Sequence, residues 1–471
     1  MNSMSNRPPT VYIGVGIENC WMIEPASRPR TDVRPLDVFE QMEHYRLWKE
    51  DLRRAAEAGV NAIRYSVPWY RSNPAPGKYD WDWIARPLDR LSQLGIVPIM
   101  DLLHYGAPMW LDNGVLNKTF PWRFAEYAGA FAERFAGQVD HYTPVNEPQT
   151  SAMFAGYQKR WPPYLCGVDG WAQVSLRLAE AMVLASRTLR SAARNVVLIS
   201  ADCFWSPGWD ECSALAGTAV SDKDENTELL LSYLPASLAY GRIQPTSALA
   251  RALAKLGYTD ETFAWFATHA QPPDLFGFNY YPYGWDGSEA GCHQKRDDLV
   301  ARCAAVYREF GRPIYITETS GGLTDDEKIL WIEALTQAVN TLRRQGIAWR
   351  GINWWPLFDT IQWDYRENGR SVSECIVPGG WNNGLYRIEP SSGGELRRVP
   401  TRAVQAWREF SRSIQHDKTG TLHSYRCGWV GTTLVYCCAA AAEGTGAGRA
   451  CCRRGCEPGT TRQGQGSTGT C

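Results

Sequence analysis

Short apolar runs rich in β-branched residues alternate with longer segments of helical periodicity along most of the chain. Eight such runs predict strands: Val11–Ile17, Val60–Val67, Val97–Leu103, Tyr142–Asn146, Val196–Ala201, Leu275–Tyr280, Ile314–Glu318 and Gly351–Trp355. The longer segments predict helices, among them Tyr45–Ala58, Trp83–Leu94, Arg123–Phe135, Trp171–Ala193 and Asp325–Gln345. A repeated strand–helix order is typical of a parallel sheet covered by helices. Eight strands favour a closed α/β fold, the (β/α)8 or TIM barrel, over an open sheet.

The end of the chain differs in composition from the rest. The segment Arg397–Arg412 predicts a last helix that begins near Thr401. Past Cys427 the composition changes, and the run CCAAAAEGTGAGRACCRRGCEPGTTRQGQGSTGTC at the end of the chain is rich in Ala, Gly, Thr and Cys and nearly devoid of bulky core residues. Such a segment cannot bury enough apolar surface to offset the entropy that is lost on ordering. We therefore expect one barrel domain over residues 1–415 and a disordered, low-complexity tail over residues 416–471.

Charge and hydropathy exclude several classes of partner. The chain has 471 residues, and its 49 Lys and Arg nearly balance its 50 Asp and Glu. This balance gives no reason to expect nucleic acid or an acidic membrane surface as a partner. No apolar run approaches the roughly 18 residues of a membrane span, and residues 1–10 lack the pattern of a secretory signal. We expect a cytoplasmic protein. Its 21 Trp and 22 Tyr can fill a large core and can also form flat faces for sugar rings.

The 14 cysteines fall into two groups. Seven are scattered over the first 426 residues without the spacing of metal ligands: Cys20, Cys166, Cys203, Cys212, Cys292, Cys303 and Cys375. In a cytoplasmic protein these are expected to be buried thiols rather than disulfides. The other seven lie in the tail, where ligand pairs at regular spacing are also lacking. No metal or organic cofactor is expected.

Polar residues at the strand ends identify the candidate chemistry, because barrel active sites lie at the carboxyl ends of the strands. The fourth predicted strand ends in HYTPVNEPQ, which places Asn146 and Glu147 at the rim. The seventh ends in YITETSGG, which places Glu318 there. Glycosidic cleavage needs two carboxyl groups, one of which protonates the leaving oxygen while the other lies opposite. A single Glu at a strand end is more often a solvated or salt-bridged residue, but two at opposing rims favour a glycosidase.

With these motifs the sequence resembles glycoside hydrolase family 1, within a larger clan of (β/α)8 retaining glycosidases, over about residues 11–410. YTPVNEP resembles the Thr-x-Asn-Glu-Pro motif of the family. The resemblance implies that Glu147 is the general acid/base and that Asn146 binds the sugar 2-hydroxyl. YITETSGG resembles the nucleophile motif Ile/Val-Thr-Glu-Asn-Gly, which implies that Glu318 is the nucleophile; Thr319 stands where Asn is usual.

Further segments match the family in the same order. WKEDLRRAAEAGVNAIRYSVPWY contains Arg64, which the resemblance makes a hydrogen-bonding partner of the nucleophile. A guanidinium beside Glu318 favours the ionised carboxylate and is expected to lower its pKa. LLHYGAPMWL resembles a His-Trp-Asp-Leu-Pro segment, which implies that His104 binds a glycone hydroxyl; a lone His on a strand is otherwise more often a packed core residue. LFGFNYYPYG resembles Gly-x-Asn-Tyr-Tyr, which implies that Asn279 lies near the glycone and Tyr281 beside the nucleophile.

The eighth strand and the first show departures that affect the choice of sugar. GINWWPLFDTIQW implies that Trp355 lies under the sugar and that Gln362 and Trp363 bind its outer hydroxyls. The family commonly has Glu at the position of Gln362, but a neutral amide still binds a diol by donating and accepting. Where the family carries Gln in Tyr-Gln-x-Glu-Gly, this chain reads GIENCWMIEP, and Glu18 is expected to take that role.

These residues predict a retaining β-glycosidase, β-glucosidase-like, that cleaves a small carbohydrate or an aryl or alkyl β-glycoside by double displacement. Glu318 attacks the anomeric carbon, while Glu147 protonates the leaving group and later serves as base for water. A β-galactosidase or β-xylosidase of the same clan is the alternative within this reaction class. The alternative from another class is a carbohydrate-binding barrel without turnover, which needs neither the two carboxylates nor Arg64.

Overall fold

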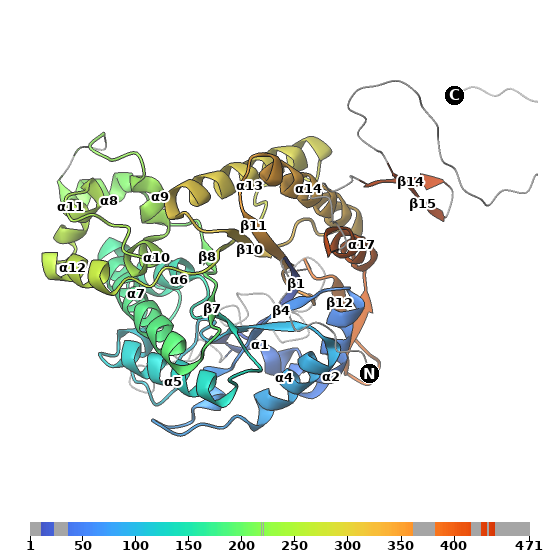
Figure 1. Cartoon of the computed structure of the whole chain (residues 1–471), viewed down its shortest axis with the longest axis horizontal. Coiled ribbons are helices and arrows are strands. Elements are labelled where there is room, and N and C mark those ends of the chain that lie inside the picture. The colour runs from blue at the N-terminus through green and yellow to red at the C-terminus, as the bar shows by residue number, and fades with distance from the viewer. Residues whose placement is uncertain are drawn as a thin grey trace, which may run out of the picture. The chain divides into compact units, whose positions relative to one another are not determined.

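The computed structural model describes residues 11–22, 36–217, 219, 221–360, 382–415, 425–430 and 433–438. The chain divides into two compact units, Met1–Leu422 and His423–Cys471. Figure 1 shows the strands of the first unit at its centre and the longer helices around them.

A parallel sheet forms the core of the first unit. Its strands pair in the order β7-β6-β5-β4-β1-β11-β10-β9-β8, and every pair is parallel. They are β1 (Tyr12–Ile17), β4 (Ala62–Ser66), β5 (Val97–Asp101), β6 (His141–Thr143), β7 (Val197–Leu198), β8 (Asp202–Cys203), β9 (Phe276–Asn279), β10 (Ile314–Thr319) and β11 (Trp349–Trp354). Each predicted strand has its counterpart here.

The two ends of the sheet belong to one stretch of chain. β7 pairs with β6 and β8 pairs with β9, and only three residues separate them. Between them single bridges join Ile199 to Leu275 and Asn146 to Ala201. A Cβ at Gly277 would overlap the carbonyl oxygen of Ser200, so the backbones approach closely here. The sheet therefore closes on itself, and the predicted (β/α)8 barrel is confirmed.

The helices include those that the sequence pattern predicts, with ends that differ by about one turn at most. Thr324 and Glu327 begin α14 with a capping box, and Gly95 and Gly311 end α4 and α13 with a positive φ. The predicted helices correspond to α2 (His44–Glu57), α4 (Asp82–Leu94), α5 (Phe120–Arg134), α7 (Gly167–Ala192), α14 (Asp325–Arg344) and α17 (Ala403–Gln415).

Several elements were not predicted. The helix α13 (Glu289–Phe310) carries its few buried residues among many charged ones, so its amphipathic period is weak. Short elements fill the connections: α1 (Val38–Gln41), α3 (Trp69–Ser72), η1 (Gly114–Leu116), α6 (Pro148–Ser151), η2 (Ala152–Tyr157), α8 (Trp209–Ala216), α9 (Thr227–Ser232), α10 (Leu234–Ala239), α11 (Ala248–Lys255), α12 (Asp260–His269), and the strand pairs β2 (Trp21–Met22) with β3 (Leu36–Asp37) and β12 (Tyr386–Pro390) with β13 (Leu396–Pro400).

The cysteines of the barrel are free thiols, as far as the described residues extend. Cys20, Cys212, Cys292 and Cys303 are buried and Cys203 is half-buried, whereas Cys166 is exposed, so its expected burial is wrong. Cys375 lies outside the described residues. None of the helices in the described ranges is both long and apolar enough to cross a membrane.

The second unit contains one described feature, an antiparallel pair of β14 (Tyr425–Val430) and β15 (Thr433–Cys438). The sequence pattern did not predict these strands. The remainder of the unit lies outside the described residues, so the disordered tail stays a prediction, as does its boundary after residue 415.

Truncation after Gln415 is expected to leave kcat/KM and the melting temperature nearly unchanged, because residues 416–471 are poor in core-forming residues. Differential scanning calorimetry and an activity assay would measure both quantities. A truncation after Pro400 is the matched control, because it also removes Trp407 and Phe410, which are buried; it should destabilise the protein strongly. A large fall in melting temperature on the first truncation would show that the tail packs or binds a ligand.

Candidate active site

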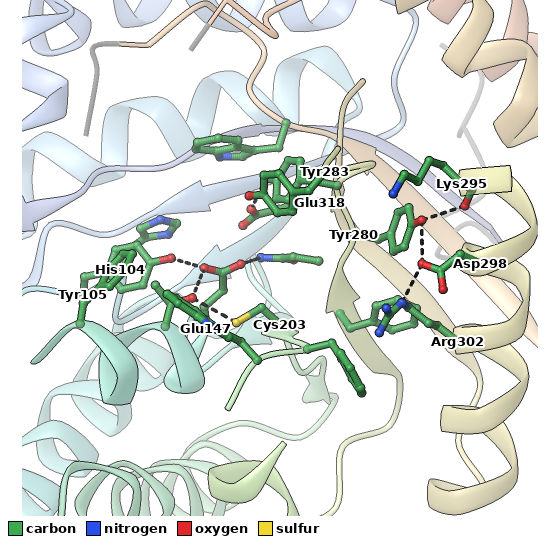
Figure 2. A pocket seen from close by; sticks show the side chains of 18 of the residues that line it. His104, Tyr105, Glu147, Cys203, Tyr280, Tyr283, Lys295, Asp298, Arg302 and Glu318 are labelled. Atoms are coloured by element: carbon green, nitrogen blue, oxygen red, sulfur yellow. Dashed lines mark hydrogen bonds and ion pairs between the residues drawn. The ribbon is translucent and has the colours of Figure 1, made fainter. Parts of the chain in front are cut away.

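Side chains from the carboxyl ends of most strands converge on one cavity of about 830 Å³ (Figure 2). Glu147, which follows β6, and Glu318, near the end of β10, both line this cavity, and both are buried. His104, Asn279, Tyr281 and Trp355 line it as well. The structure thus brings together two carboxyl groups from opposite sides of the barrel with four of the nine predicted substrate-binding residues.

Both carboxylate oxygens of Glu318 accept hydrogen bonds. Nη1 of Arg64 donates to Oε1 at 2.5 Å, and the Tyr281 hydroxyl donates to Oε2 at 2.6 Å. Nη2 of Arg64 donates to Asp101 at 2.5 Å and to the amide oxygen of Asn146 at 2.7 Å. Arg64 is fully buried on β4, so its position relative to Glu318 is fixed by the barrel.

Opposing effects set the pKa of Glu318. Burial raises the pKa of this carboxyl above its usual value, and the negative charge of Glu147 adds to the increase. Arg64 lowers the pKa, as expected, but its effect is smaller than that of burial. The expected lowering by Arg64 is confirmed, but the pKa of Glu318 is raised overall, because burial, which the motif alone does not reveal, has the larger effect.

Three uncharged groups donate hydrogen bonds to the carboxylate of Glu147. The hydroxyls of Tyr105 and Thr150 donate to Oε2 at 2.5 and 2.8 Å, and Nδ2 of Asn279 donates to Oε1 at 2.8 Å. The backbone of Glu147 is left-handed, with φ 36° and ψ 62°, which is uncommon for a residue with a Cβ. Its N–H donates to the carbonyl of Ala201 at 2.6 Å.

The local sequence explains the abrupt turn at Glu147. Pro148 follows at the first position of α6, where its lack of an N–H removes no helical hydrogen bond. The strand therefore ends at the rim, and the short helix that starts at Pro148 places Thr150 within reach of the carboxylate.

Asp101 links Arg64 to His104. Its Oδ2 lies 3.0 Å from Nδ1 of His104, and Nε2 of the same ring lies 3.4 Å from Nδ2 of Asn146. The histidine is thus oriented at the rim rather than packed in the apolar core.

The remaining predicted residues differ in whether they line the cavity. Glu18 is buried, with Oε1 3.6 Å from Nε of Arg64, and it is not among the described residues that line the cavity. Burial raises its pKa well above the usual value, while Arg64 opposes the increase. Trp355 lines the cavity, with its ring 6.2 Å from that of Tyr281. Gln362 and Trp363 lie outside the described residues.

Sequence reasoning missed three residues that contact the predicted ones: Asp101, Tyr105 and Thr150. Asp101 ends β5 and could have been found by the same strand-end argument that identified Glu147. Tyr105 lies in the loop after β5 and Thr150 in the short helix α6, and no motif marks either residue. Over the described ranges, His, Cys, Asp and Glu form no group of three or more that could hold a metal ion.

A model of glycosyl hydrolase family 1 matches residues 31–201, the part of the chain that supplies Arg64, His104 and Glu147. Over this segment the chain is similar to glycosyl hydrolase family 1. The resemblance predicted from the sequence is confirmed, and relatives named β-glucosidase support the predicted enzyme class, a glycoside hydrolase.

Curated relatives extend the similarity beyond the matched segment. β-Glucosidase A of Thermotoga maritima is 23% identical over 361 residues, which cover 68% of this chain and 79% of that protein. The bifunctional β-D-glucosidase/β-D-fucosidase of Bifidobacterium breve is 36% identical over 118 residues. That match covers 23% of this chain and 26% of the relative, so it spans about a quarter of the relative's length.

Solved structures share the barrel fold of this chain. The β-glucosidase of Thermotoga maritima in complex with castanospermine aligns with a TM-score of 0.65 at 18% identity. The alignment covers 88% of this chain and 99% of that structure. At this identity the likeness shows the barrel fold.

Proposed function

We propose that this chain is a retaining β-glucosidase in which Glu318 is the nucleophile and Glu147 the general acid/base. One observation supports the assignment most strongly: the two carboxyl groups share a cavity but have different partners. Glu318 is bound to the Arg64 guanidinium, which stabilises the ionised form that a nucleophile needs. Glu147 is bound only by neutral groups within the described part of the chain.

The partners of Glu147 are compatible with both of its protonation states. The hydroxyls of Tyr105 and Thr150 donate to the carboxylate, and either can rotate to accept from the carboxylic acid. The protonated form would donate to the leaving oxygen in the first step. The carboxylate would then accept a proton from the water that releases the sugar from Glu318.

The sugar-binding roles are part of the same proposal. His104 and Asn146 are fixed at the rim through Asp101 and Arg64, which suits hydroxyl recognition. Trp355 offers an aromatic face, and Glu18, Gln362 and Trp363 complete the proposed set. We propose a small β-glycoside as the binding partner, with neither nucleic acid nor a membrane.

Glucose is the proposed sugar because relatives are named for it, among them β-glucosidase A and the β-glucosidase 1B of Phanerodontia chrysosporium. A β-galactosidase or β-xylosidase is the alternative. Hydrolysis of a panel of aryl β-glycosides would separate these activities by kcat/KM. A barrel that only binds sugar is disfavoured because it would need neither carboxyl group nor Arg64.

Hydrolysis is expected to proceed with retention, so that a β-glucoside first releases β-glucose. Retention requires carboxyl groups that lie about 5–5.5 Å apart, whereas inverting enzymes separate them by about 6.5–9.5 Å to admit a water. Proton NMR of the anomeric signal during the first minutes of reaction measures the outcome before mutarotation. Initial release of α-glucose would exclude Glu318 as a nucleophile.

We also propose a cytoplasmic location. It is supported by the free thiols of the barrel, since cysteines of proteins in oxidising compartments more often form disulfides.

A further inference from the structure

The cavity reaches well beyond the two carboxyl groups, toward the helix α13. Lys295, Asp298 and Arg302 of α13 line this extension together with Tyr280 and Phe204. Figure 2 shows the α13 residues on one side of the pocket and His104 and Tyr105 on the other. The proposed mechanism uses none of these α13 side chains.

Arg302 is held in one orientation by two contacts. Its Nε donates to Oδ2 of Asp298 at 2.9 Å, and its guanidinium lies 4.2 Å from the centre of the Phe204 ring. Asp298 is itself fixed by the hydroxyl of Tyr280, whose single proton is shared between Oδ2 of Asp298 at 3.0 Å and the Lys295 carbonyl oxygen at 2.8 Å. Among the described residues, the two Nη groups of Arg302 form no hydrogen bond, and its side chain is 30% exposed.

The net charge of the α13 side of the cavity, formed by Lys295, Asp298 and Arg302, is opposite to that of the part that contains Glu147 and Glu318. Lys295 and Arg302 supply two positive charges against the one negative charge of Asp298, and Nζ of Lys295 has no partner in the described part of the chain. A planar guanidinium with free Nη groups matches a carboxylate, to which it can donate two parallel hydrogen bonds. An anion would be repelled by Glu147 and Glu318 at the other end, so it fits only beside α13.

A chain of contacts shows which part of the substrate would reach α13. Thr150 donates to Glu147 and contacts Sγ of Cys203 at 3.0 Å. Phe204 follows Cys203 directly and is 44% exposed, so the extension begins beside the proposed acid/base. Glu147 would protonate the glycosidic oxygen, which departs with the aglycone. The extension beside Glu147 would therefore hold the aglycone. Tyr283, which is 68% exposed and also lines the cavity, adds a second aromatic surface.

We propose that this extension is an aglycone subsite that selects an aromatic leaving group bearing a carboxylate, through Arg302 and Lys295. The inference rests on the proposed β-glucosidase function and deepens it, because it names the class of aglycone. Phe204 and Tyr283 would pack against the ring, and Arg302 would bind the acid.

The test compares two aryl β-glucosides of nearly equal shape, 4-carboxyphenyl and 4-carbamoylphenyl β-glucoside. The measured quantity is the ratio of their kcat/KM values, in the wild type and in variants, so that the difference between the two phenols as leaving groups cancels. Arg302→Gln is expected to lower the ratio of kcat/KM for the carboxylate to kcat/KM for the amide about 10-fold. This factor corresponds to the loss of one hydrogen bond to a charged group. Lys295→Gln should lower it by a smaller factor.

Arg308→Gln is the matched control, because Arg308 lies on the same helix, is exposed and does not line the cavity. It should leave the ratio unchanged, and melting temperatures would show whether any variant is unfolded. A ratio that stays constant in both Arg302→Gln and Lys295→Gln would overturn the subsite, while turnover of the glucosides would leave the proposed function intact. If the wild type turns over neither substrate nor any glycoside of the panel, the proposed function fails and the inference with it.

Discussion

Glu318→Ala is expected to abolish hydrolysis of every β-glycoside, with a loss in kcat on the order of 10⁵-fold or more, as for other covalent nucleophiles. Without this carboxylate no glycosyl-enzyme intermediate can form. The variant also removes the acceptor of the Arg64 and Tyr281 hydrogen bonds. Steady-state kinetics on an aryl β-glucoside, with both an activated and a poor leaving group, measures the loss.

The product formed with azide identifies the role of Glu318. Azide can enter the space that the carboxylate leaves and attack the anomeric carbon from that face, so Glu318→Ala should yield an α-glycosyl azide. Glu126→Ala on α5 is the control, because Glu126 is exposed and lies outside the cavity; its activity should equal that of the wild type. Full activity in Glu318→Ala would mean that the site lies elsewhere.

Glu147→Ala is expected to give a different pattern, because protonation matters only when the leaving group is a poor one. For an alkyl or unactivated aryl glucoside the loss should be about 10²–10⁴-fold, the usual contribution of general acid catalysis. A dinitrophenyl glucoside should still glycosylate Glu318 rapidly, and the intermediate should then accumulate for want of a base. Pre-steady-state kinetics would record the burst of dinitrophenol.

Azide again separates the two roles. It needs no general base, so it should restore turnover in Glu147→Ala and give a β-glycosyl azide. Thr150→Val tests the support of Glu147: it removes one donor at nearly constant volume and should lower kcat far less than Glu147→Ala. If the anomeric outcomes of the two Ala variants are exchanged, the nucleophile and the acid/base have been assigned the wrong way round.

The barrel could be predicted from the sequence because its strands are buried on both faces. β1, β4 and β10 are buried along their whole length, which produces continuous apolar runs that stand out from the helices. The strand ends then identified Glu147 and Glu318 without any knowledge of the loops. Arg64 was placed beside Glu318 only through the resemblance to the family.

The rest depends on three-dimensional proximity that no local pattern encodes. The upward shift of the Glu318 pKa results from burial, and the partners of Glu147 come from the loop after β5, from α6 and from β9. The α13 side of the cavity was missed because Lys295 and Arg302 look like ordinary solvated charges on a weakly amphipathic helix. The contact of Arg302 with Phe204 appears only when the segment after β8 and α13 are brought together.

The divided strand β7–β8 links Glu147, the proposed acid/base, to the motions of the barrel. The N–H of Glu147 is bonded to Ala201, in the short interval where the sheet closes through single bridges rather than a continuous ladder. Segments held by few hydrogen bonds open more often than the rest of a fold. Each such opening would release the main chain of Glu147 while the opposite side, with Arg64 and Glu318, stays in place. The segment β7–β8, where the sheet closes, would therefore set how often the proposed acid/base and nucleophile are aligned. On heating, activity would then be lost at a lower temperature than the fold.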